Sequence, residues 1–378
     1  MKFTVQPSDL KTAFQAVKGV VQSKPAMPVL ENILLRPDGD SAVTLTATDQ
    51  ETTITARMVV DEAVGLAPFL IPAQRLSDFI GNAMGEWPVM LDTDGDEIIL
   101  GDGFGDFRFF GNSVVKDFPV TPDIKEEEGM TIPMDASRLV ESASAAVRFT
   151  GNDSLRPIMS GVCLDFRTDG LRVCASDSKI LYRDILRDVA SERNAVVVVN
   201  RKVIEAMTAH CSLSEPVEVS FDTRSVRIRQ SEIQIVGRLV DGRFPNFDAV
   251  IPKNNNREVV LNRSVLSAAV KRVSISANKS TNQIRLRFNG GSRLTLEASD
   301  IDFSLQSKFS VDTVSQKNLE GEHLTAVRAS LFLSILSTFA KDVTEIVMLM
   351  GEPNRAMLVK SSADSERVCL IMPMQVVD

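Results

Sequence analysis

Three short strings of one kind recur along the chain of 378 residues: Ala47-Thr48-Asp49, Ala175-Ser176-Asp177 and Ala298-Ser299-Asp300. Their aspartates are 128 and 123 residues apart, and each string follows a run in which apolar and polar residues alternate. Such alternation is typical of a strand with one buried face, and Asp is common in the turn that follows a strand. A strand and turn that recur at one period indicate an internal repeat.

Two amphipathic segments accompany each string and keep the same period. In each segment the apolar residues lie three or four positions apart, as on the buried face of a helix, and Ser8, Asp135 and Asn262 are the expected N-caps of the first helix of each repeat. In chain order the six predicted helices span residues 8–21, 73–84, 135–147, 200–210, 263–273 and 328–340. Three copies of one order predict a tandem triplication with a period of about 126 residues.

The segments between the predicted helices have the length and period of strands. Because they do not alternate regularly with helices, each repeat is predicted to be α+β, with mostly antiparallel strands and two helices on one face. Polar, turn-rich segments at 121–129 and 252–257 are typical of linkers. The sequence therefore predicts three domains: 1–125, 126–253 and 254–378.

Charge is distributed unevenly along the chain. The formal net charge is −8, yet the helical windows, extended to residues 24, 148 and 341 at three of their ends, together hold eight more basic than acidic residues. If the helices share one face, that face attracts phosphates while the rest of the molecule repels them. The alternative is that Lys and Arg are simply good helix formers, although Glu forms helices equally well and is rare in these windows.

Several classes of protein are not indicated. The apolar runs are far shorter than the ~20 residues of a membrane span, and the opening Met1-Lys2-Phe3-Thr4-Val5 reads as a strand rather than a signal peptide. Four cysteines without a CxxC pair and two histidines do not make the usual zinc cluster, so neither a metal nor another cofactor is expected. Unpaired thiols and the lack of a signal favour the cytoplasm.

Little in the sequence indicates catalysis. No G-x-S-x-G, P-loop or HExxH pattern is present, and the glycine-rich residues 101–105 are predicted to form a hairpin. The three recurring aspartates are expected to cap turns in three different domains rather than to hold one ion. His210 and His323 are expected to have ordinary surface roles, and the cysteines to act as small apolar residues.

Two longer motifs are more specific. The first reads Leu239-Val240-Asp241-Gly242-Arg243-Phe244-Pro245-Asn246-Phe247 and is followed by Val250-Ile251-Pro252; the second is Leu370-Ile371-Met372-Pro373-Met374. With the opening strand and the threefold repeat, they resemble the bacterial DNA polymerase III beta subunit family, the sliding clamps, over essentially the whole chain. The resemblance implies a fold of three tandem DNA-clamp domains and a head-to-tail dimeric ring, with two helices per repeat inside and antiparallel sheets outside.

The resemblance also implies a function. Clamps of this family are non-catalytic processivity factors: the ring encircles double-stranded DNA without sequence specificity and tethers the replicative DNA polymerase. Further implied partners are an ATP-driven clamp loader and other polymerases and repair proteins that carry short linear clamp-binding motifs; no membrane is involved. By position, the implied DNA contacts are Lys24, Gln74, Arg75, Asn152, Arg156, Arg201 and Lys202.

Two more surfaces follow from the resemblance. An apolar pocket for partner peptides is implied at Met159, Ser176, Leu181, Pro245, Val250, Leu370, Ile371, Met372, Pro373 and Met374, and flexible methionines suit a pocket that accepts several peptides. The dimer seam is implied at Phe107 or Phe109 with Ile275. The chain departs from the family at Ser178-Lys179-Ile180 and at Gln375-Val376-Val377-Asp378, so its peptide preference could differ in detail.

Two other readings stay open at this point. An enzyme acting on nucleotides or DNA through an unmarked acidic site would show Mg²⁺-dependent turnover by the isolated chain. A clamp-like scaffold that never meets DNA would show no salt-sensitive interaction with DNA.

Overall fold

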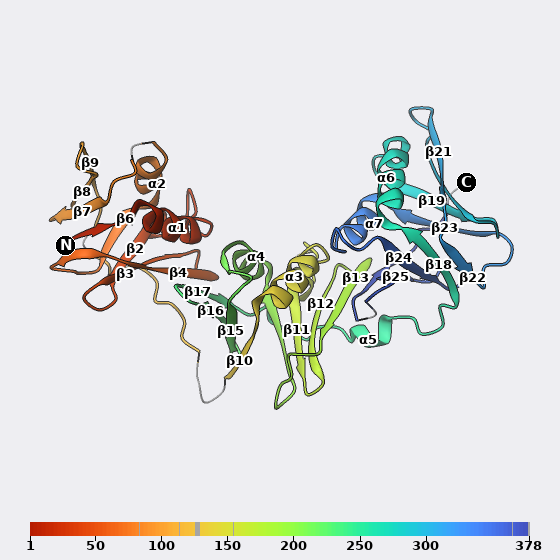
Figure 1. Cartoon of the computed structure of the whole chain (residues 1–378), viewed down its shortest axis with the longest axis horizontal. Helices are drawn as coiled ribbons and strands as arrows, with labels where there is room; N and C mark the ends of the chain where they lie inside the picture. The colour runs from red at the N-terminus through yellow and green to blue at the C-terminus, as the bar shows by residue number, and fades with distance from the viewer. Residues whose placement is uncertain (83, 113, 125–128, 154, 365, 377–378) are drawn as a thin grey trace. The chain divides into compact units, whose positions relative to one another are not determined.

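The structure is a computed structural model that describes residues 1–82, 84–112, 114–124, 129–153, 155–364 and 366–376 (Figure 1). The predicted linker residues Glu126, Glu127 and Glu128, and Val377 and Asp378 of the tail, lie outside these ranges. Within them, the elements follow one another three times in the same order: a strand, a helix, a short 3-10 helix, a run of strands, a second helix and three more strands.

The first repeat contains β1 (Lys2–Val5), α1 (Pro7–Lys18), η1 (Pro28–Glu31), β2 (Asn32–Pro37), β3 (Ala42–Thr48), β4 (Thr52–Val59), β5 (Asp61–Val64), β6 (Phe69–Pro72), α2 (Ala73–Asn82), β7 (Val89–Asp94), β8 (Glu97–Gly101) and β9 (Asp106–Phe110). The second contains β10 (Met130–Asp135), α3 (Ala136–Val147), η2 (Pro157–Ser160), β11 (Gly161–Arg167), β12 (Gly170–Ser176), β13 (Ile180–Leu186), β14 (Ala195–Asn200), α4 (Arg201–His210), β15 (Pro216–Phe221), β16 (Ser225–Gln230) and β17 (Ile233–Arg238). These bounds confirm the predicted helices and the hairpin between β8 and β9.

The third repeat follows a short helix, α5 (Phe247–Val250), that the sequence did not predict. It contains β18 (Arg257–Asn262), α6 (Arg263–Val273), η3 (Ser274–Ser276), β19 (Gln283–Phe288), β20 (Arg293–Asp300), β21 (Leu305–Asp312), β22 (Ser315–Lys317), β23 (His323–Arg328), α7 (Ala329–Leu336), β24 (Glu345–Met350), β25 (Met357–Ser361) and β26 (Val368–Ile371). The threefold repeat of the α+β unit is therefore confirmed.

The helix starts agree with the predicted caps in two of three cases. Asp135 Oδ1 accepts the amide of Ser137 at 2.7 Å, and Asn262 Oδ1 accepts that of Val265 at 3.1 Å. Ser8 is not a cap: α1 begins one residue earlier, at Pro7, because the fixed φ of proline suits the first helical position.

The recurring aspartates cap turns, as predicted. Asp49 Oδ1 accepts the amide of Thr52 at 2.8 Å, Asp177 Oδ1 accepts that of Ile180 at 2.8 Å, and Asp300 Oδ1 accepts that of Asp302 at 3.1 Å. The string that revealed the repeat is thus a strand followed by a capped turn.

The chain forms two compact units, Met1–Glu141 with Val199–Val240, and Ser142–Val198 with Asp241–Asp378. Among the described residues, the first unit has a five-stranded sheet (β5-β1-β7-β8-β9) and an eight-stranded sheet (β10-β15-β16-β17-β4-β3-β2-β6). The second has a nine-stranded sheet (β14-β11-β12-β13-β26-β25-β24-β18-β22) and a four-stranded sheet (β21-β20-β19-β23). Each unit thus combines strands from two neighbouring repeats.

Two antiparallel ladders join the repeats within these units. In the first unit β17 pairs with β4, from Ile233 opposite Ala56 to Gly237 opposite Thr52. In the second unit β13 pairs with β26, from Ile180 opposite Ile371 to Arg183 opposite Val368. The hairpin ladders within the repeats, such as β2–β3, β11–β12 and β19–β20, are antiparallel as well, in agreement with the mostly antiparallel strands that the sequence predicts.

The helices of each unit lie in a row on one side of its sheets (Figure 1). In the first unit α1 packs on β3 and β4 and contacts both α2 and α4, while α4 packs on β17 of the same sheet. In the second unit α6 packs on α7, and Arg148, just after α3, donates to the carbonyl of Ser337, just after α7, at 3.1 Å. The predicted arrangement of helices on one face is therefore present in both units.

The core agrees with most of the predicted helix faces, although Val265, expected on the apolar face of α6, is 49% exposed. Leu10, Phe14 and Val17 of α1 are buried, and Cys174 is buried, with the pKa of its thiol raised by that burial. His323 is also buried, only 5% exposed, so the expected surface role is wrong for it. It opens β23 against the ring of Phe288, and burial lowers its pKa.

A buried ion pair stands beside the ladder that joins the second and third repeats. Arg367 Nη2 lies 3.0 Å from Asp184 Oδ2, and the side chains are 6% and 0% exposed. The hydroxyl of Tyr182 donates to the same carboxylate at 3.2 Å and lies 3.2 Å from Ser142 Oγ.

Replacing Arg367 by Met should destabilise the protein, because the Asp184 carboxylate then stays buried without its cation. The expected loss is about 3–5 kcal/mol of unfolding free energy, measured from the urea unfolding midpoint. The matched control is Lys317→Met, which breaks a pair with Glu258 whose lysine is 68% exposed and should cost less than about 1 kcal/mol. Equal midpoint shifts in the two variants would contradict the role of the buried pair.

Candidate nucleic-acid and peptide interfaces

Five of the seven expected DNA contacts belong to the helical row of the first unit. Gln74 and Arg75 lie in the first turn of α2, Arg201 and Lys202 in the first turn of α4, and Lys24 follows α1. All five side chains are exposed. The row α2-α1-α4 therefore carries a set of cations on its solvent side.

Helix formation does not account for where these cations lie. Arg75, Arg201 and Lys202 stand at helix N-termini, where the helix dipole disfavours positive charge. At α4 the cap is the side chain of Asn200, which accepts the amide of Lys202 at 2.9 Å. The alternative that these residues are only good helix formers is therefore the weaker one.

The other two expected contacts, Asn152 and Arg156, lie in the second unit, in the loop between α3 and η2. Both side chains are exposed, and the loop is closed by the amide of Gly151, which donates to the carbonyl of Met159 at 2.7 Å. Leu155 beside them is 88% exposed. Sequence reasoning missed this leucine, and an isolated apolar residue in a polar loop was the available signal.

All ten expected pocket residues belong to the second unit, and contacts link several of them. Leu181 of β13 lies opposite Leu370 of β26, and Ser176 at the end of β12 lies opposite Leu181. Beyond β26 the amide of Met372 donates to the carbonyl of Lys179 at 2.8 Å, and that of Met374 donates to Ala326 at 2.7 Å. The C-terminal segment is thus held between β13 and β23.

The segment 241–250 approaches the same region. Gly242 has a φ of +119°, and a Cβ at this position would lie 3.6 Å from Ile158, the neighbour of Met159. Asn246 then caps α5 by accepting the amide of Ala249 at 3.3 Å. Pro245 and Val250 therefore lie on a segment that passes beside η2.

The expected pocket residues differ in exposure. Four of them are at most 7% exposed: Ser176, Leu181, Leu370 and Ile371. The others are exposed or half-buried: Met159, Pro245, Val250, Met372, Pro373 and Met374. Val250 and Met372 are 50% and 41% exposed, so these two apolar side chains face solvent.

The family models of the DNA polymerase III beta subunit match the chain in three consecutive parts: the N-terminal domain at residues 1–122, the central domain at 135–246 and the C-terminal domain at 248–375. The chain belongs to the DNA polymerase III beta subunit family.

Its relatives are the beta sliding clamps. That of Pseudomonas aeruginosa is 26% identical over 99% of this chain and 100% of the relative, and that of Escherichia coli is 23% identical over 99% and 100%. The solved sliding clamps of Pseudomonas aeruginosa and Bacillus subtilis superpose with TM-scores of 0.92 and 0.91, at 23% and 20% identity, with full coverage of both chains. The fold is therefore that of three tandem clamp domains.

As a member of this family the protein is a sliding clamp, the non-catalytic processivity factor of a DNA polymerase III holoenzyme in DNA replication. The alternative of an enzyme acting on nucleotides is thereby wrong. In the part of the chain that the structure describes, no group of three or more His, Cys, Asp or Glu side chains could hold a metal ion. No described helix is long and apolar enough to cross a membrane.

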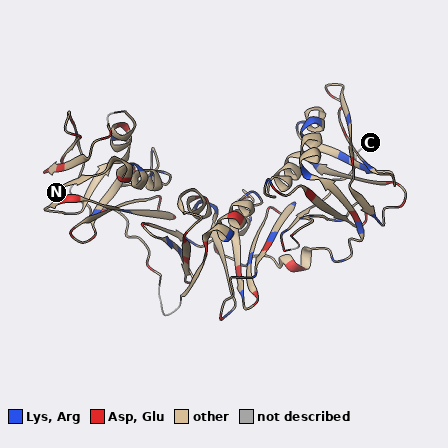
Figure 2. Ribbon diagram, in the orientation of Figure 1, with Lys and Arg blue, Asp and Glu red and all other residues tan. Residues whose placement is uncertain are grey.

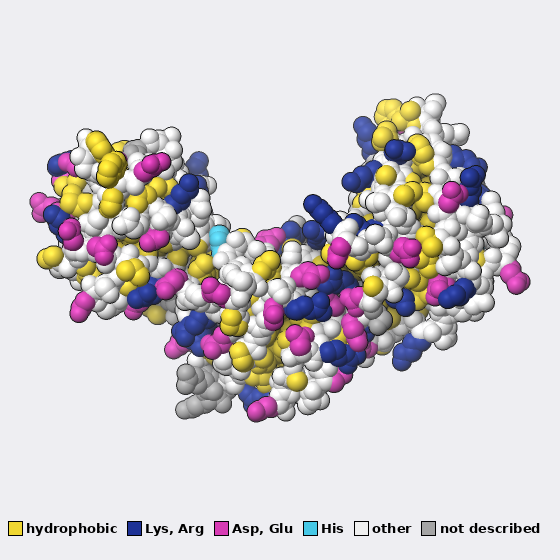
Figure 3. Space-filling model, in the orientation of Figure 1, with side chains coloured by type: hydrophobic (Ala, Val, Ile, Leu, Met, Phe, Trp, Pro, Cys, Tyr) yellow, Lys and Arg dark blue, Asp and Glu magenta, His cyan; other side chains and the backbone are white. Residues whose placement is uncertain are grey.

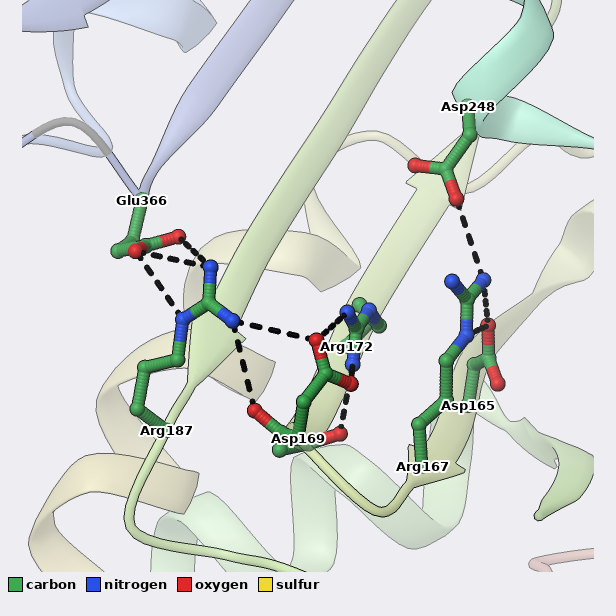
Figure 4. A network of polar contacts seen from close by, with 8 residues as sticks. Asp165, Arg167, Asp169, Arg172, Arg187, Asp248 and Glu366 are labelled. Atoms are coloured by element: carbon green, nitrogen blue, oxygen red, sulfur yellow. Dashed lines mark hydrogen bonds and ion pairs between the residues drawn. The ribbon is translucent and has the colours of Figure 1, made fainter.

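A network of ion pairs in the clamp joins β11 to α5, and the residue after β13 to the segment before β26 (Figure 4). Arg167 of β11 donates to Asp165 at 2.9 Å and to Asp248 of α5 at 3.2 Å, and its guanidinium lies 5.9 Å from the centre of the Phe247 ring. These contacts fix α5, on which Val250 lies.

The second half of the network binds Glu366, in the segment just before β26. Arg187 lies 3.1 Å from Glu366 and 3.2 Å from Asp169, which also pairs with Arg172. The hydrogen bond from Arg172 lowers the pKa of Asp169 to about 2. Because this pKa is below the ordinary 3.8 of the carboxyl, the stabilisation by Asp169 is present above pH 4 and is lost as the pH falls toward 2.

Replacing Arg167 by Met should loosen α5, because both Asp248 and Phe247 lose their partner. Hydrogen exchange of the amides in residues 241–250 is expected to become faster, by about tenfold, as measured by mass spectrometry. The matched control is Arg187→Met, which removes the other half of the network and should leave exchange at 241–250 unchanged. Unchanged exchange in Arg167→Met would show that the packing of Phe247 alone holds the segment.

Proposed function

We propose that this sliding clamp is a homodimeric ring that encircles double-stranded DNA, and that it divides into domains 1–125, 126–253 and 254–378. The observation that carries the proposal is which strands the two inter-repeat ladders use. β4 and β13 are the third strands after the first helix of their repeats, and β17 and β26 are the third strands after the second helix. Both ladders therefore pair the same two positions of the repeat.

One strand of each kind is left at an edge. The first repeat keeps β9, the third strand after its second helix, and the third repeat keeps β21, the third strand after its first helix. Pairing β9 of one protomer with β21 of another would reproduce the ladders within the chain. Two protomers joined in this way at both ends give six equivalent junctions and a closed ring, which leaves neither strand as an open edge.

Exposed apolar side chains at both edges support this seam. Phe110 of β9 is 74% exposed, while Ile301 and Phe303, in the turn before β21, are 84% and 64% exposed. The expected seam residue Ile275 is 77% exposed, next to α6.

Phe107 and Phe109 are half-buried and less accessible than the other seam residues. Their rings are 5.5 Å apart, and Phe107 also contacts Phe79 of α2 at 5.9 Å. We propose Phe107, Phe109 and Ile275 as parts of a seam that buries apolar surface from both edges.

The helices are proposed to line the ring and to meet DNA phosphates through Lys24, Gln74, Arg75, Asn152, Arg156, Arg201 and Lys202. Figure 2 shows basic segments on the helices, for example on α6, which carries Arg263, Lys271 and Arg272. The face seen in Figure 3 mixes both signs of charge over the sheets. Contacts to phosphates alone give weak, salt-sensitive binding without sequence preference, as sliding requires.

The proposed partners bind the surface formed by Met159, Pro245, Val250, Met372, Pro373 and Met374 above a floor formed by Ser176, Leu181, Leu370 and Ile371. They are the replicative polymerase, an ATP-driven clamp loader, and other polymerases and repair proteins with short linear motifs. The departures at Ser178-Lys179-Ile180 border this surface, so they are proposed to adjust the peptide preference. The four free cysteines agree with the cytoplasm as the proposed location.

Encirclement predicts that the loaded clamp stays on nicked circular DNA and is lost from the same DNA after linearisation, because a ring can slide off an end. The clamp would be loaded onto the circle by its ATP-driven loader. Gel filtration before and after linearisation of the DNA would then separate DNA-bound clamp from free clamp and measure the bound fraction. Equal retention on both forms would contradict encirclement, and no retention on either would favour the scaffold that never meets DNA.

The peptide surface predicts that removing residues 372–378 abolishes binding of the polymerase and the loader while the native mass of the ring stays unchanged. As a milder change, Met372→Ala should weaken binding of a clamp-binding peptide by about fivefold to thirtyfold, measured by calorimetry. Met27→Ala is the matched control, since Met27 is 39% exposed and lies in the first repeat. Undiminished binding in the truncated protein would make the assignment of the pocket wrong.

A further inference from the structure

We propose that four carboxylates beside the expected DNA contacts hold the affinity of the ring for DNA low: Asp49, Asp78, Asp153 and Glu205. The inference rests on the proposed function and deepens it, because it names the residues that set the strength of the same site. It follows from the partners that the structure gives to each expected contact.

On α2 one carboxylate takes both expected contacts. Gln74 Nε2 donates to Asp78 Oδ1 at 2.8 Å, and Arg75 Nη1 lies 3.7 Å from Asp78 Oδ2. Asp78 is placed one helical turn after them and so shares their face of the helix. A phosphate approaching Arg75 therefore meets a carboxylate at the same place.

On α4 the two neighbouring cations have different partners. Arg201 Nε donates to Glu205 Oε1 at 2.7 Å, and Lys202 Nζ donates to Asp49 Oδ2 at 2.6 Å. The Asp49 side chain is only 3% exposed, because its other oxygen caps the turn after β3, and its hydrogen bond raises the pKa of Lys202. Lys202 therefore stays charged but is held by an acid that cannot turn away.

In the loop of the second unit the same arrangement recurs. Arg156 lies 3.1 Å from Asp153 Oδ2 through both Nε and Nη2. Within the described residues, five of the seven expected contacts thus have a carboxylate partner, and only Lys24 and Asn152 lack one.

Fold stability gives little reason for these pairs. The paired side chains of Arg75, Arg156, Arg201 and Lys202 are all more than half exposed, and exposed ion pairs contribute about 0–1 kcal/mol. The carboxylates affect DNA affinity more than they affect the free energy of unfolding, because each one opposes the attraction of its cation for a phosphate. In water, one unit charge at about 7 Å from a phosphate changes the affinity about threefold. The carboxylates therefore favour rapid sliding over tight binding.

The test is the triple variant Asp78→Asn, Asp153→Asn and Glu205→Gln, in which each change removes a charge and keeps the size of the side chain. Asp49 is left in place because its side chain is only 3% exposed and also caps a turn. Binding of the full-length protein to a short fluorescent DNA duplex would be measured by anisotropy over a series of NaCl concentrations. We expect about tenfold to thirtyfold tighter binding at low salt and a steeper dependence of log affinity on log salt, since more cations then meet phosphates.

The control is Asp38→Asn, which removes one carboxylate, paired with Arg57 of β4 at 2.6 Å and away from the expected contacts, and is matched in charge to Glu205→Gln alone. Equal strengthening of DNA binding in these two single variants would reduce the effect to net charge and overturn the inference. The double variant Arg75→Ala and Arg201→Ala tests the proposed DNA contacts separately from the effect of the carboxylates. If the double variant binds DNA more weakly while the triple variant binds like the natural protein, the contacts stand and the inference fails. If the double variant binds DNA as well as the natural protein does, the proposed contacts themselves fail.

Each single amide variant would be measured as well, so that a fold defect in the triple variant does not decide the result. Glu205 lies on the exposed side of α4, so the single variant Glu205→Gln should bind DNA about threefold tighter than the natural protein. Binding no tighter than that of the natural protein in all three single variants would overturn the inference.

Discussion

The backbone hydrogen bonds between repeats are the interaction on which the rest of this molecule depends. A repeat of this kind has two strands that need a partner from outside, and the chain supplies one for each neighbouring pair: β17 joins β4, and β26 joins β13. Main-chain pairing leaves no donors or acceptors unsatisfied along the junction and requires no particular side chain. Sequence can therefore drift, as the identity of 26% or less to the Pseudomonas and Escherichia clamps illustrates, while the architecture is kept.

The same junctions explain where partner peptides are proposed to bind. The ladder between β13 and β26 pairs Leu181 with Leu370, both buried, and the chain leaves β26 as a short apolar tail. The buried pair of Arg367 and Asp184 stands next to this ladder. The structural joint between the second and third repeats and the proposed binding surface therefore depend on the same strands.

Sequence reasoning was most successful where a local rule decides the structure. The turn aspartates, the caps at Asp135 and Asn262 and the helical periodicity each depend on neighbours within a few residues. Ser8 was preferred to Pro7 because a hydroxyl is a common cap, but the proline fixes the start of α1. His323 was misjudged because the partner that buries it, Phe288, lies on another strand.

The long-range features of the sites could not be read from the sequence. By contrast, three of the ion pairs join residues only three or four positions apart, so the sequence alone could have indicated them: Arg75 with Asp78, Arg156 with Asp153, and Arg201 with Glu205. Nothing local links Lys202 to Asp49, which are 153 residues apart. The anchoring of α5 by Arg167 also needs two distant segments. A prediction of a nucleic-acid surface should therefore count the acidic residues three or four positions from each basic residue as well as the basic residues themselves.

The mass of the native particle in solution tests the central claim most directly, because the account requires the two free strands of each protomer to be paired. Sedimentation equilibrium at micromolar concentration should give twice the 41.4 kDa of the chain, with no larger species, since a closed ring has no further open edge. A particle of one chain mass, or an open series of higher oligomers, would contradict the account.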